Sequence, residues 1–124
     1  MWKYRCYDDG GQPNLWRRWY ESNADVQGSH DSVFDGLETM VSWREPWTKF
    51  IDKGERIIEV RLSGKLEWRV FGFHSGAQRE FVVLGAGSKK GKVYTPADIK
   101  KTVIKRKKEV EADLGKAPSC GRPK

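Results

Sequence analysis

Hydrophobic and polar residues alternate along three stretches of the chain, as expected for strands with one buried face. These stretches are residues 2–7, 57–62 and 65–74. Residues 79–84 differ, because four consecutive apolar residues at 81–84 predict a central strand that is covered on both faces. Ser-Gly pairs at 63–64 and 75–76 supply turn residues between the last three strands. We therefore predict one N-terminal strand and an antiparallel sheet of three or four strands.

Two segments between the first and second of these strands have the period of amphipathic helices. The first begins at Pro13 or Asn14, and the second begins near Ser32, which with Asp35 forms a possible capping pair. The apolar residues of the two helices are Leu15, Trp16, Trp19 and Tyr20, then Val33, Phe34, Leu37, Met40 and Val41. Pro46 ends the second helix, and the apolar residues among 47–51 predict one further helical turn.

The sequence Thr95-Pro96-Ala97-Asp98 predicts the start of a C-terminal helix, with a hydroxyl N-cap followed by proline. Gly115 ends this helix, and we expect residues 116–124 to form a disordered tail. The order of strand, two helices, antiparallel sheet and basic helix gives an α+β fold. At 124 residues the chain is long enough for one domain, which we place at residues 1–115.

The positive charge of the chain is concentrated near its C-terminal end. The net charge is +7, but residues 88–124 alone hold 12 Lys and Arg against 4 Asp and Glu. A concentrated basic region favours a polyanionic partner, most often nucleic acid, although an exposed helix with solvated lysines would give the same count. The absence of a long apolar run or signal peptide leads us to expect a soluble, cytoplasmic protein with no membrane partner.

Cysteine, histidine and tryptophan give weaker indications. Cys6 and Cys120 lie at opposite ends without the spacing of a zinc site, and we interpret both as reduced thiols. His30 and His74 are interpreted as surface residues. We expect Trp16, Trp19 and Trp43 in the core, whereas Trp2 and Trp47 are either core residues or exposed anchors for a partner.

Arg69 stands out because it lies in the middle of an otherwise apolar strand, where a charge is costly unless it is used. Alternation places it on one face with Phe71 and Phe73, opposite Trp68 and Val70. Two interpretations remain open: a site residue that binds an anion, or a structural ion pair with Glu59, Glu67 or Glu80.

The segment from about Glu67 to Glu109 resembles the RelE/HigB superfamily of toxin–antitoxin toxins, close to its phage-derived branch. The likeness rests on the arginine-bearing strand 67–73, on the apolar strand that leads into Ser88-Lys89-Lys90, and on the basic segment 92–101, in which Thr95-Pro96 opens the last helix. Outside this segment, only the order of the elements fits.

The resemblance implies a ribosome-dependent endoribonuclease that cuts mRNA and is neutralised by a cognate antitoxin protein. The implied reaction is attack of the ribose 2′-hydroxyl on the adjacent phosphate, which needs cations and proton transfer but no metal or other cofactor. The implied catalytic residues are Arg69, Lys89, Lys90 and Tyr94. The implied RNA-binding residues are Arg61, Lys92, Lys100, Lys101, Lys105 and Arg106.

Some features depart from the family. Ile58 and Glu59 stand where strongly ribonucleolytic members carry lysine, with Arg61 as a possible substitute, and no carboxylate or histidine is a clear base. Two other functions therefore remain open: non-enzymatic inhibition of DNA gyrase, as in the ParE branch of the superfamily, and catalytically silent RNA binding by a protein of phage or mobile-element origin.

Overall fold

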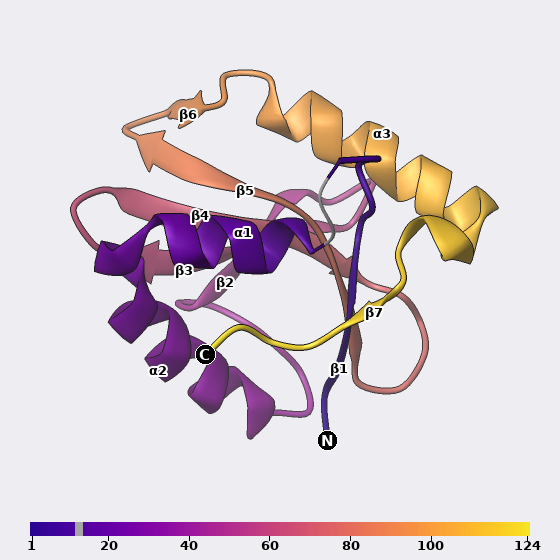
Figure 1. Cartoon of the computed structure of the whole chain (residues 1–124), viewed down its shortest axis with the longest axis horizontal. Helices are drawn as coiled ribbons and strands as arrows, with labels where there is room; N and C mark the ends of the chain where they lie inside the picture. The colour runs from indigo at the N-terminus through magenta and orange to yellow at the C-terminus, as the bar shows by residue number, and fades with distance from the viewer. Residues whose placement is uncertain (12–13) are drawn as a thin grey trace.

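A mixed β-sheet forms the middle layer of the protein, and helices cover both of its faces (Figure 1). The computed structural model describes residues 1–11 and 14–124. The strands are β1 (Lys3–Cys6), β2 (Thr48–Asp52), β3 (Ile57–Ser63), β4 (Glu67–His74), β5 (Glu80–Lys90), β6 (Val93–Thr95) and β7 (Ser119–Cys120). The helices are α1 (Leu15–Ser22), α2 (Gln27–Glu38) and α3 (Ile99–Ala112), with short 3₁₀ turns at Ala24–Val26 and Leu114–Lys116.

The strands follow the order β2-β3-β4-β5-β1-β7 across the sheet, and β6 pairs with the far end of β5. β1 runs parallel to β5, whereas the other pairs are antiparallel. The predicted α+β class is confirmed, but the sheet is mixed and has seven strands instead of three or four antiparallel ones. The parallel pairing joins residues nearly eighty positions apart, which local alternation does not reveal.

The segment 47–51 was wrongly predicted as a helical turn, because Thr48–Asp52 forms the edge strand β2. Its residues pair with β3, as in the register Thr48 to Val60 and Phe50 to Ile58. Thr48 is buried while Lys49 and Phe50 are exposed, so the apolar residues here do not mark a buried helical face.

The start of α1 agrees with the sequence prediction, whereas the starts of α2 and α3 differ from it. Asn14 caps α1 by accepting a hydrogen bond from the Arg17 amide at 3.0 Å, while Pro13 lies outside the described residues. α2 begins at Gln27, so Ser32 and Asp35 lie inside it rather than at its cap. The N-cap of α3 is Asp98, and the expected cap residue Thr95 belongs to β6.

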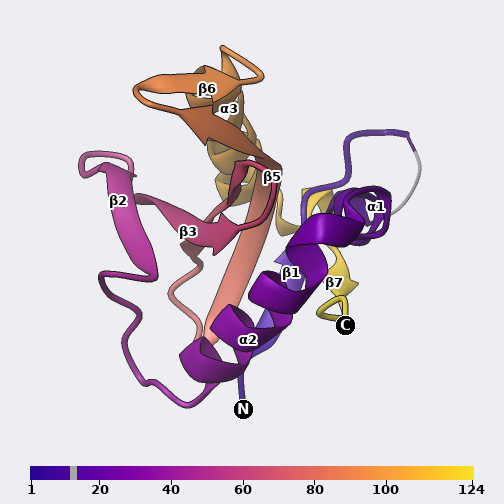
Figure 2. The same ribbon diagram turned by 90° about the vertical axis from the view of Figure 1, so that its left-hand side faces the viewer.

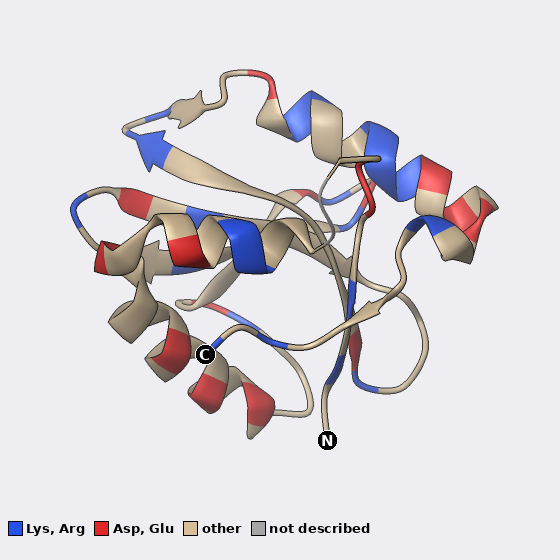
Figure 3. Ribbon diagram, in the orientation of Figure 1, with Lys and Arg blue, Asp and Glu red and all other residues tan. Residues whose placement is uncertain are grey.

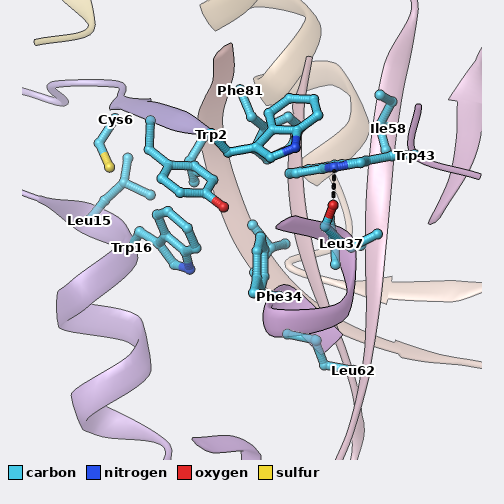
Figure 4. Packing of buried hydrophobic residues seen from close by; sticks show 14 of the residues in the cluster. Trp2, Cys6, Leu15, Trp16, Phe34, Leu37, Trp43, Ile58, Leu62 and Phe81 are labelled. Carbon is cyan, nitrogen blue, oxygen red and sulfur yellow. Dashed lines mark hydrogen bonds between the residues drawn. The ribbon is translucent and has the colours of Figure 1, made fainter. Parts of the chain in front are cut away.

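Helices α1 and α2 lie on one side of the sheet and α3 lies on the other (Figure 2). Each face of the sheet carries its own apolar core. The first lies under α1 and α2, and aromatic side chains fill it: Trp2, Trp16, Phe34 and Trp43 are all buried (Figure 4). The Trp43 indole N–H donates to the Leu37 carbonyl at 3.0 Å, which satisfies its polar atom. The second core lies under α3. Its members include Phe71, Phe73, Val82, Leu84 and Val103.

His30 is not at the surface as expected but fully buried in the first core. Trp16 Nε1 donates to His30 Nε2 at 3.0 Å, and His30 Nδ1 lies 3.0 Å from Asp31 Oδ1. His74, by contrast, is exposed.

The described helices are too short or too polar to cross a lipid bilayer.

The C-terminal segment is part of the fold, which corrects the expectation of a disordered tail at residues 116–124. β7 pairs with β1, and Cys120 forms a disulfide with Cys6, so the two cysteines are not reduced thiols as expected. Arg122 then reaches α2, where it donates to Asp35 at 2.7 Å and to Glu38 at 2.8 Å. The last residues therefore bridge β1 and α2, although no local sequence pattern predicts this contact.

Candidate functional site

The register of β3, β4 and β5 gathers charged side chains on the face of the sheet that α3 covers. Arg61 of β3 lies opposite Arg69 of β4, and Glu67 of β4 lies opposite Lys89 of β5. Glu59 lies two residues before Arg61 and therefore on the same face. Three cations from three strands thus share one region of the sheet.

Glu59 is the buried anion that holds two of these cations together. Its carboxylate is 1% exposed and accepts a hydrogen bond from Arg69 Nε at 2.9 Å. Arg61 Nε lies 3.8 Å from the other carboxylate oxygen. Two guanidinium groups directly opposite one another on neighbouring strands repel each other. The Glu59 carboxylate between Arg61 and Arg69 offsets this electrostatic repulsion.

Arg69 therefore makes the structural ion pair that the sequence left open, with Glu59 as its partner. The side chain of Arg69 is 9% exposed, and its second nitrogen donates to the Trp68 carbonyl at 2.9 Å. Its third nitrogen lies 3.8 Å from Glu67. This nitrogen is the part of the guanidinium that remains available for a ligand, because the other contacts use Nε and one donor of Nη1.

Tyr94 closes over this cluster from β6. Its ring packs edge-on against Phe71, with 5.6 Å between ring centroids, and Lys89 Nζ lies 5.1 Å from the ring centroid. Its hydroxyl donates to Glu59 at 3.5 Å. Burial, together with the negative charge of Glu59, raises the pKa of Tyr94 above its ordinary value of 10.0. The phenol therefore stays protonated at neutral pH, which suits a proton donor better than a base.

Gly87 allows β6 to approach so closely. It lies opposite Arg69 in β5, and a Cβ atom at this position would be 2.4 Å from the Thr95 carbonyl oxygen. A side chain there would push β6 away and would move Tyr94 with it.

A cleft of about 500 Å³ opens beside this cluster, at the edge of β3. Arg61, Glu67, Arg69 and Lys89 line one side of it. The other side comes from α2 and from the segment that precedes β2. Its lining residues are Ser29, Val33, Pro46 and Trp47.

The structure separates the remaining predicted site residues from this cleft. Lys90 follows Lys89 in β5 and so points to the other face, and Lys92 is exposed in the turn before β6. Lys100, Lys101 and Lys105 are exposed on α3. Arg106 turns inward instead, because its guanidinium lies over the Tyr7 ring and donates to the Leu84 carbonyl at 2.8 Å.

Two residues of the site were not predicted as such from the sequence. Glu59 was considered only as a possible partner of Arg69, although an acid inside an apolar strand, two residues from Arg61, signals a buried pair. Trp47 was considered as a core residue or as a contact for a protein partner, and not as part of this site. Its place in the cleft depends on the β2–β3 edge, which the sequence did not reveal.

Helices α2 and α3 differ in the sign of their charge (Figure 3). α2 contains three acidic residues and neither Lys nor Arg, whereas α3 contains six Lys and Arg and two Glu. The end of β5 adds Lys89 and Lys90. The basic elements therefore lie on the α3 side of the sheet, the same side as the charged cluster.

Comparison of the chain with protein-family models, with curated proteins and with solved structures found no match.

Proposed function

We propose that this protein is an mRNA endoribonuclease toxin of the RelE/HigB type, which acts on ribosome-bound mRNA in the cytoplasm and is neutralised by a cognate antitoxin. The observation that carries the proposal is the convergence of Arg61, Arg69 and Lys89 in one cleft. Cations from three strands in a partly enclosed site favour a phosphodiester, whose charge increases in the transition state. The exposed lysines of α3 would contact ribosomal RNA backbone.

Groups that line the cleft, together with Tyr94 beside it, would serve each step of the proposed reaction. The 2′-hydroxyl would lose its proton to Glu67, which lines the cleft and has a 64% exposed side chain. The 2′-oxygen would then form a bond to phosphorus as the bond to the 5′-oxygen breaks, giving a cyclic phosphate. Tyr94 would donate its proton to the leaving 5′-oxygen. Arg61 and Lys89 would stabilise the negative charge that develops on the phosphate oxygens.

In this proposal Arg69 has a mainly positioning role. Its ion pair with Glu59 fixes the floor of the cleft, and one nitrogen remains to contact a phosphate oxygen. Glu59 also accepts from Tyr94, so the same carboxylate orients the proton donor.

The neighbouring lysines 89 and 90 provide a matched test, because they point to opposite faces of one strand. We expect Lys89→Ala to lower mRNA cleavage by roughly 100-fold, as for the loss of one transition-state donor, and Lys90→Ala to change it little. The measurement is the mapping of mRNA 5′ ends after induced expression, together with growth arrest. Cuts in phase with codons would support ribosome dependence, whereas equal loss in both variants would contradict the placement of Lys89 in the site.

A second function, inhibition of DNA gyrase without catalysis, is favoured by one observation. The guanidinium of Arg69 is already engaged by Glu59, which leaves fewer free cations than a phosphodiesterase site commonly needs. Intact mRNA together with cleaved DNA trapped on gyrase would support this function. Intact mRNA and intact DNA, with RNA binding retained, would indicate a catalytically silent RNA-binding protein.

A further inference from the structure

The cleft continues around the edge of β3 beyond the charged cluster. β2 pairs with β3 only as far as Thr48 and Val60, so the edge of β3 at residues 61–63 faces the cleft instead of a full strand. Here the Arg61 amide donates to the Trp47 carbonyl at 2.8 Å, and the Ser63 amide donates to Ser29 Oγ at 2.9 Å. These two hydrogen bonds fix the far wall of the cleft relative to β3.

Trp47 is the aromatic residue of this far wall. Its side chain is 43% exposed, whereas Trp2, Trp16 and Trp43 are buried in the first core. A large indole that is held by its own backbone, beside a cationic cleft, is suited to stack on a flat ring. Unpaired nucleic-acid bases are recognised in this way, because every base has an aromatic face.

Arg61 lies between this aromatic wall and the charged cluster. Its side chain is 33% exposed, and within the described chain its buried Nε has no hydrogen-bond partner. Lys89 adds a second cation, and the exposed carboxylate of Glu67 can accept a hydrogen bond from a base amino group. The cleft thus combines a stacking surface, phosphate-binding cations and one acceptor, which together match a nucleotide within a chain better than a simple anion.

We propose that the Trp47 end of the cleft is a subsite for one unpaired RNA base, which stacks on Trp47 while Arg61 binds the adjoining phosphate. The subsite deepens the proposed function and rests on it, because it would hold a nucleotide next to the one that is cleaved. Stacking alone makes no choice among bases, so this contact contributes affinity and position rather than sequence preference.

Binding of a short labelled oligouridylate, followed by fluorescence anisotropy, tests the subsite. We expect Trp47→Ala to weaken binding about tenfold and Trp47→Phe to weaken it less, since a smaller aromatic ring remains. An oligonucleotide of the same length without bases should bind wild-type protein and Trp47→Ala equally. Arg61→Ala should instead weaken both oligonucleotides and reduce the slope of log affinity against log salt by about 0.7, the value for one phosphate on a single strand.

Phe50→Ala is the matched control, because Phe50 is 41% exposed, lies three residues away and does not line this cleft. It should bind the oligouridylate like wild type. Equal binding by Trp47→Ala and wild type, or no preference of wild type for the oligonucleotide with bases, would overturn the subsite and leave Trp47 as a contact for a protein partner. That result is distinct from failure of the proposed nuclease, which the 5′ ends of cellular mRNA report independently.

Discussion

Glu59 shows at the scale of single residues what the sequence could and could not predict about the site. Its position in the strand, and its face shared with Arg61, follow from alternation alone. The register between β3 and β4 makes Glu59 the near partner of Arg69, at 2.9 Å, while Glu67 lies farther away at 3.8 Å and Glu80 pairs elsewhere. The resemblance alone suggested Arg69 and Tyr94 as site residues, whereas the carboxylate that both contact is seen only in the folded sheet.

His30 is a second residue whose environment reverses the expectation. Its Nε2 accepts from the Trp16 indole, so the neutral ring places its proton on Nδ1, toward Asp31. A protonated ring would turn a second donor toward the indole N–H. Burial lowers the pKa of His30 below its ordinary value of 6.5, although the nearby Asp31 opposes part of that shift.

This shift predicts that the protein loses stability in mild acid. Because the folded pKa lies below the unfolded value, the unfolded state binds more protons, and stability falls as pH drops below about 6.5. Urea unfolding at about pH 7.5 and about pH 5.5 should give a lower free energy of unfolding in acid, and His30→Gln should reduce the difference. Although His74 is exposed at the end of β4, the rings of Trp2 and Trp43 lie against one side of its imidazole, and this partial desolvation lowers its pKa. Part of the pH dependence should therefore remain in the variant. An unchanged dependence in His30→Gln would contradict this account of the buried imidazole.

At the scale of elements, the long periodic segments were predicted well and the short or edge segments were not. β3, β4, α1 and α3 follow the strand and helix periods that their sequences show. β2 was missed because an edge strand exposes Phe50, and the apolar spacing then resembles a helical turn. The start of α2 was missed because its N-cap position is Val26, which has no capping side chain.

Gly87 provides a test of how β5 and β6 pack. Gly87→Ala should destabilise the protein by about 1–3 kcal/mol, because its Cβ would meet the Thr95 backbone at 2.4 Å. The proposed mRNA cleavage should also fall, since Tyr94 would move with β6. Urea unfolding measures the first effect.

Gly36→Ala is the matched control for this substitution. Gly36 lies inside α2, and a Cβ there would meet nothing within 4 Å. Alanine should therefore stabilise the helix by roughly 1 kcal/mol. If Gly36→Ala and Gly87→Ala changed the free energy of unfolding by a similar amount, the close approach of β6 to Gly87 would be contradicted.

At the scale of the whole molecule, the N-terminal strand β1 is joined to the C-terminal segment by strand pairing and by a disulfide. The Cys6–Cys120 disulfide closes a loop with a sequence separation of 114, and Arg122 fastens the same segment to α2. Such a contact lies beyond local sequence patterns, which is why the tail was expected to be disordered. Disulfides persist in oxidising surroundings, so a cytoplasmic protein would rely more on the β1–β7 pairing and on Arg122.

Reduction of this disulfide should lower the free energy of unfolding by about 2–5 kcal/mol, because a long loop is released in the unfolded chain. Urea unfolding with and without reducing agent measures the difference. The double variant Cys6→Ala/Cys120→Ala should match the reduced wild type and should not respond to the reagent. Equal free energies of unfolding for oxidised and reduced protein would contradict this prediction. They would show that the ion pairs of Arg122 and the β1–β7 pairing hold the C-terminal segment in place without the disulfide.

The separation of acidic α2 from basic α3 has a consequence for how the protein meets any large anion. Opposite charges on helices that cover opposite faces of the sheet contribute to an electric dipole, so the field of a large anion would tend to turn the α3 side toward it. The α3 side would then face the anion on contact, and a larger fraction of encounters would have a productive orientation. Dissolved salt screens this long-range attraction, so the association rate constant should fall as ionic strength rises. The shape of the cleft does not depend on ionic strength.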